Sequence, residues 1–266
     1  MTELLANYGT VGEIRFDGSC IVPTGDIIAK YAPYAVIFQG QYEHIGKKFT
    51  SIRWVGNEAG VAPYPAWNGV DEATVKSGVS TAADGDPDGK VWLPNECDTE
   101  IRSTWFWNSG NADTLRSLDD LMEVYYRSVG HGAVLLLNAN PDATGAIPET
   151  DARRAAEFGA EIKRRFGKSL METSGAGAVL EMSLGKATTI DHVVSEELIA
   201  PGERVRHYVV EGMVGDRWEK ICEGTAIGHK KIDQFDPIRV SKVRLRCIES
   251  AGEPLIRRLA VLNTTE

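Results

Sequence analysis

The chain has 266 residues, of which 42% are hydrophobic and 25% charged, a composition typical of globular proteins. Its formal net charge of −9 argues against nucleic acid or an anionic membrane surface as a partner, because both would repel it. Its apolar runs are all shorter than a bilayer span requires, whereas a neutral ligand such as a sugar is compatible with the charge.

The N-terminal part of the sequence predicts short helices and buried strands in alternation. The expected elements are a helix at 2–8, a strand at 11–16, one or two helical turns at 26–31, and strands at 34–38 and 49–55. The run YAVIF at 34–38 is continuously apolar, which is typical of a strand buried on both faces.

The middle of the sequence continues this alternation after a long loop. Residues 60–90 are rich in Gly, Pro, Asp and Ala, and a loop of this length usually forms a functional rim or lid. We then expect a strand at 90–93, a helix at 111–129, a strand at 133–137 and a charged amphipathic helix at 149–166. Strands separated by helices or long loops indicate a parallel sheet with crossover connections.

Polar residues follow each of these predicted strands. They are Asp17, Gln39, Glu58, Asn95, Glu96 and Asn138. In a (β/α) barrel the positions just after the strands form the catalytic face, so we expect these side chains to line one mouth.

The C-terminal part differs in character. Residues 167–178 are small and are predicted to form a linker, and the short strands expected after it are typical of an antiparallel β-sandwich. Those strands are expected at 189–194, 204–211, 217–222, 237–246 and 256–262. The fold prediction is therefore α/β, with part of a TIM-like barrel over 1–170 and a β-sandwich over 178–266.

Two of the polar positions suit glycoside hydrolysis, which needs one carboxyl group to attack the anomeric carbon and another to protonate the leaving oxygen. Asp17 ends one predicted strand, and Glu58 follows another 41 positions later. Both would point into the same barrel mouth.

Four segments resemble the α-L-fucosidases of glycoside hydrolase family 29, in the order in which that family carries them. They are IRFDG at 14–18, IRWVGNEAG at 52–60, VWLPNECDTEIRSTWFW at 91–107 and GAVLLLNANPDATGAIP at 132–148. The second segment resembles the subgroup that acts on α-1,3- and α-1,4-linked fucose. The resemblance covers roughly residues 1–170, and the tail resembles the β-sandwich that follows the barrel in this family.

This resemblance implies a retaining α-L-fucosidase with Asp17 as nucleophile and Glu58 as acid/base. Glu96 is the rival acid/base, and its other roles would be to bind a hydroxyl or to orient Arg102. Trp54 and Trp105 are candidates for packing on the sugar, with a place in the barrel core as the alternative, and Arg102 is a further substrate-binding candidate. The implied partner is a fucosylated oligosaccharide or glycoconjugate, with no metal and no cofactor.

The sequence departs from the family pattern at several points. Arg15 stands where an aromatic residue is common, and Ser103-Thr104 replaces a Pro-Gly pair. The family's barrel begins some two hundred residues earlier and includes a His-His pair that this sequence lacks, so we expect a truncated chain with little activity by itself. A non-catalytic fragment or sugar-binding protein is therefore the alternative function. No CxxC pair is present, and the four cysteines are expected to be reduced thiols.

Overall fold

The computed structural model describes all residues except 19, 21, 40–51, 72–83 and 266. Contacts divide the chain into two units, which are described separately below. The first unit comprises Met1–Gly56 and Trp67–Glu96, and the second comprises Asn57–Ala66 and Cys97–Glu266. The division predicted near residues 170–178, between barrel and sandwich, stays a prediction.

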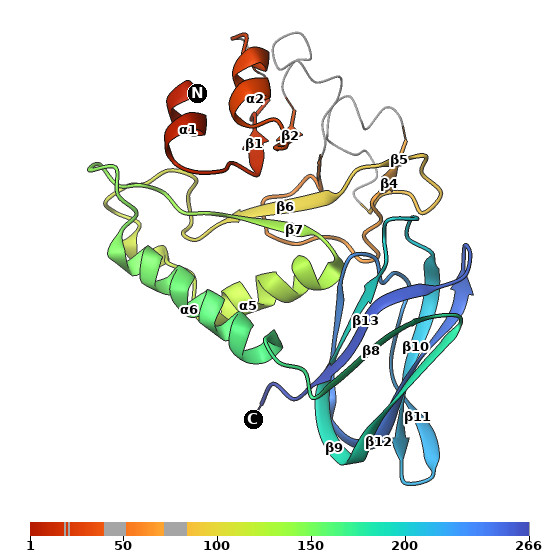
Figure 1. Cartoon of the computed structure of the whole chain (residues 1–266). Helices are drawn as coiled ribbons and strands as arrows, with labels where there is room; N and C mark the ends of the chain where they lie inside the picture. Colours follow the sequence, from red (N-terminus) through yellow and green to blue (C-terminus); the bar gives the residue numbers. More distant parts are fainter. Residues whose placement is uncertain (19, 21, 40–51, 72–83, 266) are drawn as a thin grey trace. The chain divides into compact units, whose positions relative to one another are not determined.

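The first unit contains the predicted N-terminal helices and a pair of parallel strands (Figure 1). These elements are α1 (Thr2–Asn7), β1 (Glu13–Arg15), α2 (Gly25–Tyr31) and β2 (Val36–Phe38). Apolar side chains from all four, among them Leu5, Ile14, Ile28 and Ile37, form one small core. The predictions at 2–8, 11–16, 26–31 and 34–38 are therefore confirmed in kind, and the strands β1 and β2 pair in parallel as expected.

A second group of strands, of which β6 continues past Glu96 into the second unit, corrects the sequence prediction. The strand predicted at 90–93 is β5 (Val91–Trp92), and it pairs antiparallel with β4 (Gly69–Val70) instead of joining a parallel sheet. The parallel partner of β3 (Arg53–Trp54) is β6 (Asn95–Glu100), which was not predicted. Its sequence, NECDTE, is polar although its first five residues are buried, so it has no apolar run from which the strand could be predicted. Residues 49–51 of the predicted third strand lie outside the described residues.

The second unit includes two amphipathic helices, α5 (Leu118–Arg127) and α6 (Glu149–Phe166), and the strand β7 (Val134–Asn138). The helix predicted at 111–129 begins later, because Ser117 and Asp120 form a capping box at residue 118. The helix predicted at 149–166 and the strand predicted at 133–137 are confirmed. Tyr125 of α5 and Phe158 of α6 meet edge to face, with ring centroids 6.2 Å apart.

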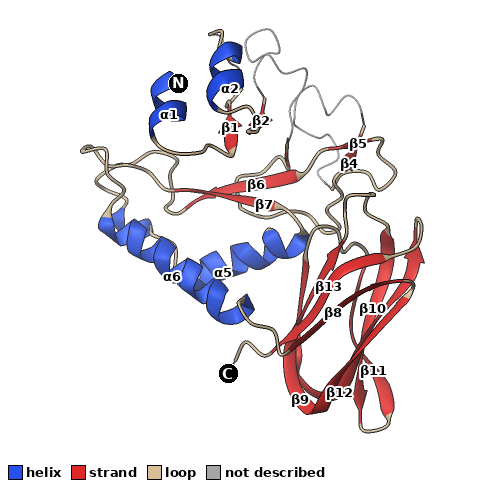
Figure 2. Cartoon of the chain, in the orientation of Figure 1, coloured by secondary structure: helices blue, strands red, loops and turns tan. Residues whose placement is uncertain are grey.

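The C-terminal part of the second unit forms one antiparallel sheet of six strands in the order β11-β10-β12-β9-β13-β8 (Figure 2). The strands are β8 (Met171–Ala176), β9 (Val179–Glu197), β10 (Val205–Val214), β11 (Arg217–Gly224), β12 (Lys231–Ser250) and β13 (Leu255–Leu262). The predicted linker is wrong, since β8 occupies it. This edge strand is mostly exposed, so its sequence lacks the apolar alternation of a half-buried strand.

The long strands of this sheet bend. The pairing of β12 with β9 shifts register between Gln234 and Ile238 and again between Val240 and Lys242, and such bulges turn a strand. Side chains of β9, β10, β12 and β13 form a common core, which a flat sheet could not do with its own residues. The sheet therefore curls over itself, while its division into the two layers of a sandwich stays a prediction.

Within the described part of the chain, no helix combines the length and the apolar character needed to cross a membrane. The same residues hold no group of three or more His, Cys, Asp or Glu side chains that could bind a metal ion. All four cysteines are free thiols. Burial raises the pKa of Cys247 to about 12, which makes that thiol unreactive near neutral pH.

Candidate active site

Asp17 lies two residues after the end of β1, at the carboxyl end of the parallel pair that β1 forms with β2. The ladder continues to Phe16, whose amide donates to the carbonyl of Phe38 over 3.0 Å. The amide of Gly18 donates to Oε1 of Gln39 over 2.7 Å. The segments that follow β1 and β2 are therefore linked next to Asp17. Gln39 has φ 55°, a conformation unusual for a residue with a side chain and one that often marks functional sites. The Asp17 side chain itself is exposed.

Glu96 lies within β6, opposite Trp54 of β3, and its side chain is fully buried. Its Oε1 accepts a hydrogen bond from Nη1 of Arg15, and the two side chains form an ion pair. The Arg15 guanidinium also lies over the ring of Phe38, 4.4 Å from the centroid. Arg15, two positions before Asp17, was noted from sequence only as a departure from the family pattern. In the structure it is the ionic partner of a candidate catalytic carboxylate.

Glu58 lies on an exposed segment of the second unit. Nε1 of Trp105 donates to its Oε2 over 3.0 Å, which brings two predicted site residues together. The segment is shaped by Asn57, whose side chain accepts from the amide of Ala59 and donates to the carbonyl of Val61. Gly60, with φ +67°, passes so close to α5 and β6 that an added Cβ would lie under 3.0 Å from two side chains.

The segment carrying Trp105 is held by three asparagines. Asn138, at the end of β7, donates to the carbonyl of Trp105 over 3.2 Å and to Asn140 over 2.9 Å. Asn140 donates to the carbonyl of Thr104 over 3.0 Å, and Asn111 donates to the Thr104 hydroxyl over 2.7 Å. Thr104, one of the two residues that replace Pro-Gly, therefore anchors this turn through its hydroxyl. Only Asn138 was singled out from sequence.

Arg102 is nearly buried and binds Asp151 of α6 through two hydrogen bonds, of 2.8 and 2.6 Å. Its remaining nitrogen donates to Asn111, and the bond to Asp151 raises the pKa of the guanidinium further. These contacts brace the segment after β6 against the start of α6. The carboxylate that Arg102 holds is thus Asp151 and not Glu96, and a direct contact of Arg102 with substrate stays a prediction.

The six site residues predicted from the sequence are divided between the two units. Asp17, Glu96 and Trp54 belong to the first unit, and Trp54 is half-buried in β3. Glu58, Arg102 and Trp105 belong to the second. His44, taken from sequence as structural or solvent-facing, lies outside the described residues.

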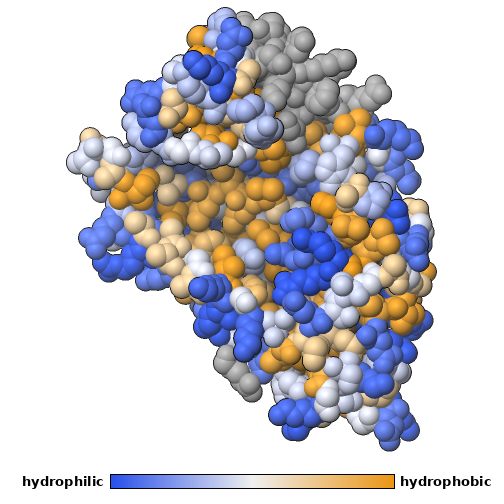
Figure 3. Space-filling view, viewed as in Figure 1, coloured by the Kyte–Doolittle hydropathy of each residue, from blue (hydrophilic) through white to orange (hydrophobic). Residues whose placement is uncertain are grey.

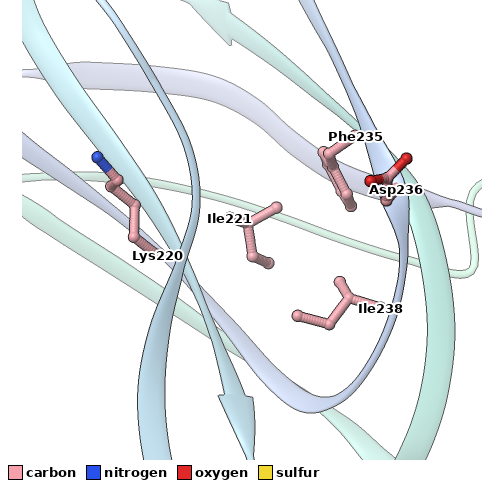
Figure 4. A pocket seen from close by; sticks show the side chains of 5 residues that line it. All are labelled: Lys220, Ile221, Phe235, Asp236 and Ile238. Carbon is pink, nitrogen blue, oxygen red and sulfur yellow. The ribbon is translucent and has the colours of Figure 1, made fainter.

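Two pockets in the described sheet contain none of these residues. One, of about 470 Å³, lies between β11 and β12 and is lined by the apolar side chains of Ile221, Phe235 and Ile238, with Lys220 and Asp236 at its rim (Figure 4). The other, of about 320 Å³, lies where Glu172, Glu196, Arg257 and Arg258 pair with one another, and hydrophilic side chains gather over this part of the sheet (Figure 3). Because these charges neutralise each other, the second pocket has no net charge that would attract a charged ligand.

The proteins to which this chain is similar include several named as fucosidases. No protein-family model matches the chain. Among the solved structures it resembles is one from Bacteroides thetaiotaomicron, named provisionally an alpha-L-fucosidase, on which it superimposes with a TM-score of 0.85 and 32% identity. That match covers 98% of this chain and 62% of the other. A GH29 fucosidase from Ruminococcus gnavus, solved in complex with fucose, matches with a TM-score of 0.79 and 26% identity, covering 96% of this chain and 61% of the other.

Among curated proteins, the chain is 31% identical over 297 residues to a protein of Oryza sativa subsp. japonica named provisionally alpha-L-fucosidase 1. The match covers 96% of this chain and 57% of the rice protein. The chain thus spans about three fifths of the length of the relatives it matches.

Proposed function

We propose that this chain is part of a retaining α-L-fucosidase of glycoside hydrolase family 29. One observation carries the proposal. Asp17 stands exposed at the carboxyl end of a parallel strand pair, in a chain that is 32% identical, over a match covering 98% of it, to a solved protein named provisionally an alpha-L-fucosidase. Catalytic residues occupy this strand end in barrel enzymes.

The reaction follows from two carboxyl groups with different tasks. The Asp17 carboxylate attacks the anomeric carbon of the fucose, the glycosidic bond breaks, and Glu58 gives its proton to the leaving oxygen. Water then attacks the fucosyl-enzyme while Glu58 accepts its proton, and fucose leaves with retained configuration. This mechanism predicts a separation of about 5–5.5 Å between the two carboxyl groups.

Glu58 is the better acid/base of the two glutamates. A general acid/base must reach both the leaving oxygen and the attacking water, and Glu58 is exposed. Glu96 is fully buried and forms an ion pair with Arg15. Glu96 is instead suited to accept hydrogen bonds, from Arg15 and from a sugar hydroxyl.

The proposed substrate is a terminal α-linked fucose on an oligosaccharide or glycoconjugate, with 1,3 or 1,4 linkage. The fucose complex of the Ruminococcus gnavus relative supports the sugar, and the IRWVGNEAG segment supports the linkage. Trp54 and Trp105 are proposed to pack on apolar faces of the sugar. The mechanism requires no metal and no cofactor.

The test compares two proteins: the 266-residue chain and a fusion that adds the N-terminal part of a fucosidase relative. Whichever releases fucose from an α-1,3/1,4-fucosylated oligosaccharide is called the active form below. A fluorinated fucosyl fluoride should trap the intermediate, and peptide mass spectrometry should locate the added sugar on Asp17. We expect strong turnover only in the fusion. Absence of fucose release from both proteins, or a trapped sugar on another residue, would contradict the proposal.

A further inference from the structure

The segment that carries Glu58 is anchored at its other end in the C-terminal sheet. Tyr64 lies six residues after Glu58, and its hydroxyl donates to the carbonyl of Ala226 over 2.8 Å. The same oxygen accepts from the amides of Thr225 and Ala226, over 3.0 and 3.2 Å. One hydroxyl therefore satisfies three backbone groups of the turn that follows β11.

The sheet is shaped to receive this side chain. At Gly224 an added Cβ would lie 2.4 Å from the Tyr64 hydroxyl oxygen and 2.5 Å from that of Tyr208, so the glycine leaves room for both tyrosines. The Tyr64 ring lies 5.1 Å from the ring of His131, and the Lys231 ammonium lies 4.9 Å from its centroid. Burial raises the pKa of Tyr64 to about 12, so the hydroxyl keeps its proton and donates at every working pH.

The chain between Glu58 and Tyr64 is also held. The amide of Gly60 donates to the carbonyl of Asp98 over 2.8 Å, and the amide of Ala62 donates to that of Arg127 over 2.9 Å. Nδ1 of His131 lies 3.0 Å from the carbonyl of Ala62. Tyr64 and these bonds together hold the short segment that carries Glu58.

We infer that Tyr64 is a positioning residue for Glu58, through which the C-terminal sheet takes part in acid/base catalysis. This inference rests on the proposed function. Sub-ångström placement of a general acid matters, since a misplacement of about 1 Å can cost on the order of a hundredfold in rate.

The test uses the active form and two substrates that differ in their need for an acid. Methyl α-L-fucoside has a poor leaving group and needs protonation, whereas a nitrophenyl α-L-fucoside needs little. For Tyr64→Phe we expect kcat/KM to fall about tenfold on the methyl fucoside and less than about twofold on the nitrophenyl fucoside. Tyr126→Phe removes another buried hydroxyl of the second unit, one that bonds His192 and Arg165, and should affect both substrates equally.

A second measurement needs no activity. In the ¹⁵N-labelled chain, the indole N–H signal of Trp105, assigned with Trp105→Phe, reports its hydrogen bond to Glu58. Tyr64→Phe should move this signal toward its position in Glu58→Gln, and Tyr126→Phe should leave it in place. If Tyr64→Phe fails to fold, His131→Gln, which removes the ring packed against Tyr64 and the contact with the carbonyl of Ala62, should move the signal in the same direction.

These experiments distinguish a failure of the proposed role of Glu58 from a failure of the inferred role of Tyr64. If Glu58→Gln shows no dependence on the leaving group, Glu58 is not the acid and the proposed mechanism fails with it. If Glu58→Gln shows that dependence while Tyr64→Phe slows both substrates equally and leaves the Trp105 signal unmoved, only the role of Tyr64 is overturned.

Discussion

The two carboxylates proposed to share the chemistry are supported in different ways. Asp17 follows a strand, and its place is set by the backbone ladder between β1 and β2, with one side-chain bond from Gln39. Glu58 lies on a segment without regular structure: its side chain accepts from Trp105, 47 positions away, and Tyr64, further along the same segment, is anchored to Ala226. A nucleophile can thus be placed by strand geometry alone, whereas this acid/base depends on tertiary contacts that any of several substitutions can loosen.

The largest effect should come from the nucleophile itself. Asp17→Asn keeps the size and the strand end but removes the attacking charge, so we expect kcat of the active form to fall by roughly 10⁴-fold or more, as for other covalent catalysts. The fold should be unchanged, because the Asp17 side chain is exposed. Thermal unfolding and fucose release, measured on one preparation, check both statements. An active Asp17→Asn protein would remove the nucleophile assignment.

A smaller and more selective loss is expected at Glu58. General acid–base catalysis contributes about 10²–10⁴-fold, so Glu58→Ala should lose an amount in this range on a methyl fucoside and much less on a nitrophenyl fucoside. Azide should restore turnover of the activated substrate, because it attacks the fucosyl-enzyme without needing a base. Glu96→Gln is the matched control: if the rescue by azide occurs there and not at Glu58→Ala, the two glutamates exchange roles.

The same contrast explains how far the sequence could predict the molecule. The helix at Glu149–Phe166 follows from apolar periodicity, the strand β2 from a continuous apolar run, and the position of Asp17 from the strand that precedes it. The polar strand β6 and the exposed edge strand β8 were missed, because neither carries an apolar pattern. The partners of Glu58 were not predictable from spacing, since Trp105 lies 47 positions away in the sequence.

The loop geometry around Glu58 can be tested with two glycines. Both have positive φ, +85° at Gly56 and +67° at Gly60, but an added Cβ meets nothing within 4 Å at Gly56. At Gly60 it would lie 2.8 Å from Val124 and 2.9 Å from Thr99. Gly60→Ala should therefore displace the segment and lower kcat about tenfold or more, whereas Gly56→Ala should show only backbone strain, on the order of 1 kcal/mol.

Equal losses of kcat and of thermal stability in the two alanine variants would contradict this account, because they would show that backbone strain, and not the contact with α5 and β6, decides the position of Glu58.

The smallest effects should come from single hydrogen bonds, and they allow a direct comparison of the two supports. Trp105→Phe keeps an aromatic ring but removes the indole donor to Glu58, and Gln39→Met removes the acceptor for the Gly18 amide beside Asp17. A single hydrogen bond contributes about 0.5–1.5 kcal/mol, which corresponds to roughly two- to tenfold in rate.

We expect Trp105→Phe to reach the upper end of this range on a methyl fucoside, since no strand ladder holds Glu58. Gln39→Met should stay at the lower end, because the Phe16–Phe38 bond still fixes the strand end. Parallel measurements of kcat/KM on both substrates decide the matter: if Gln39→Met proves the more damaging variant, the nucleophile depends on side-chain support as much as the acid does.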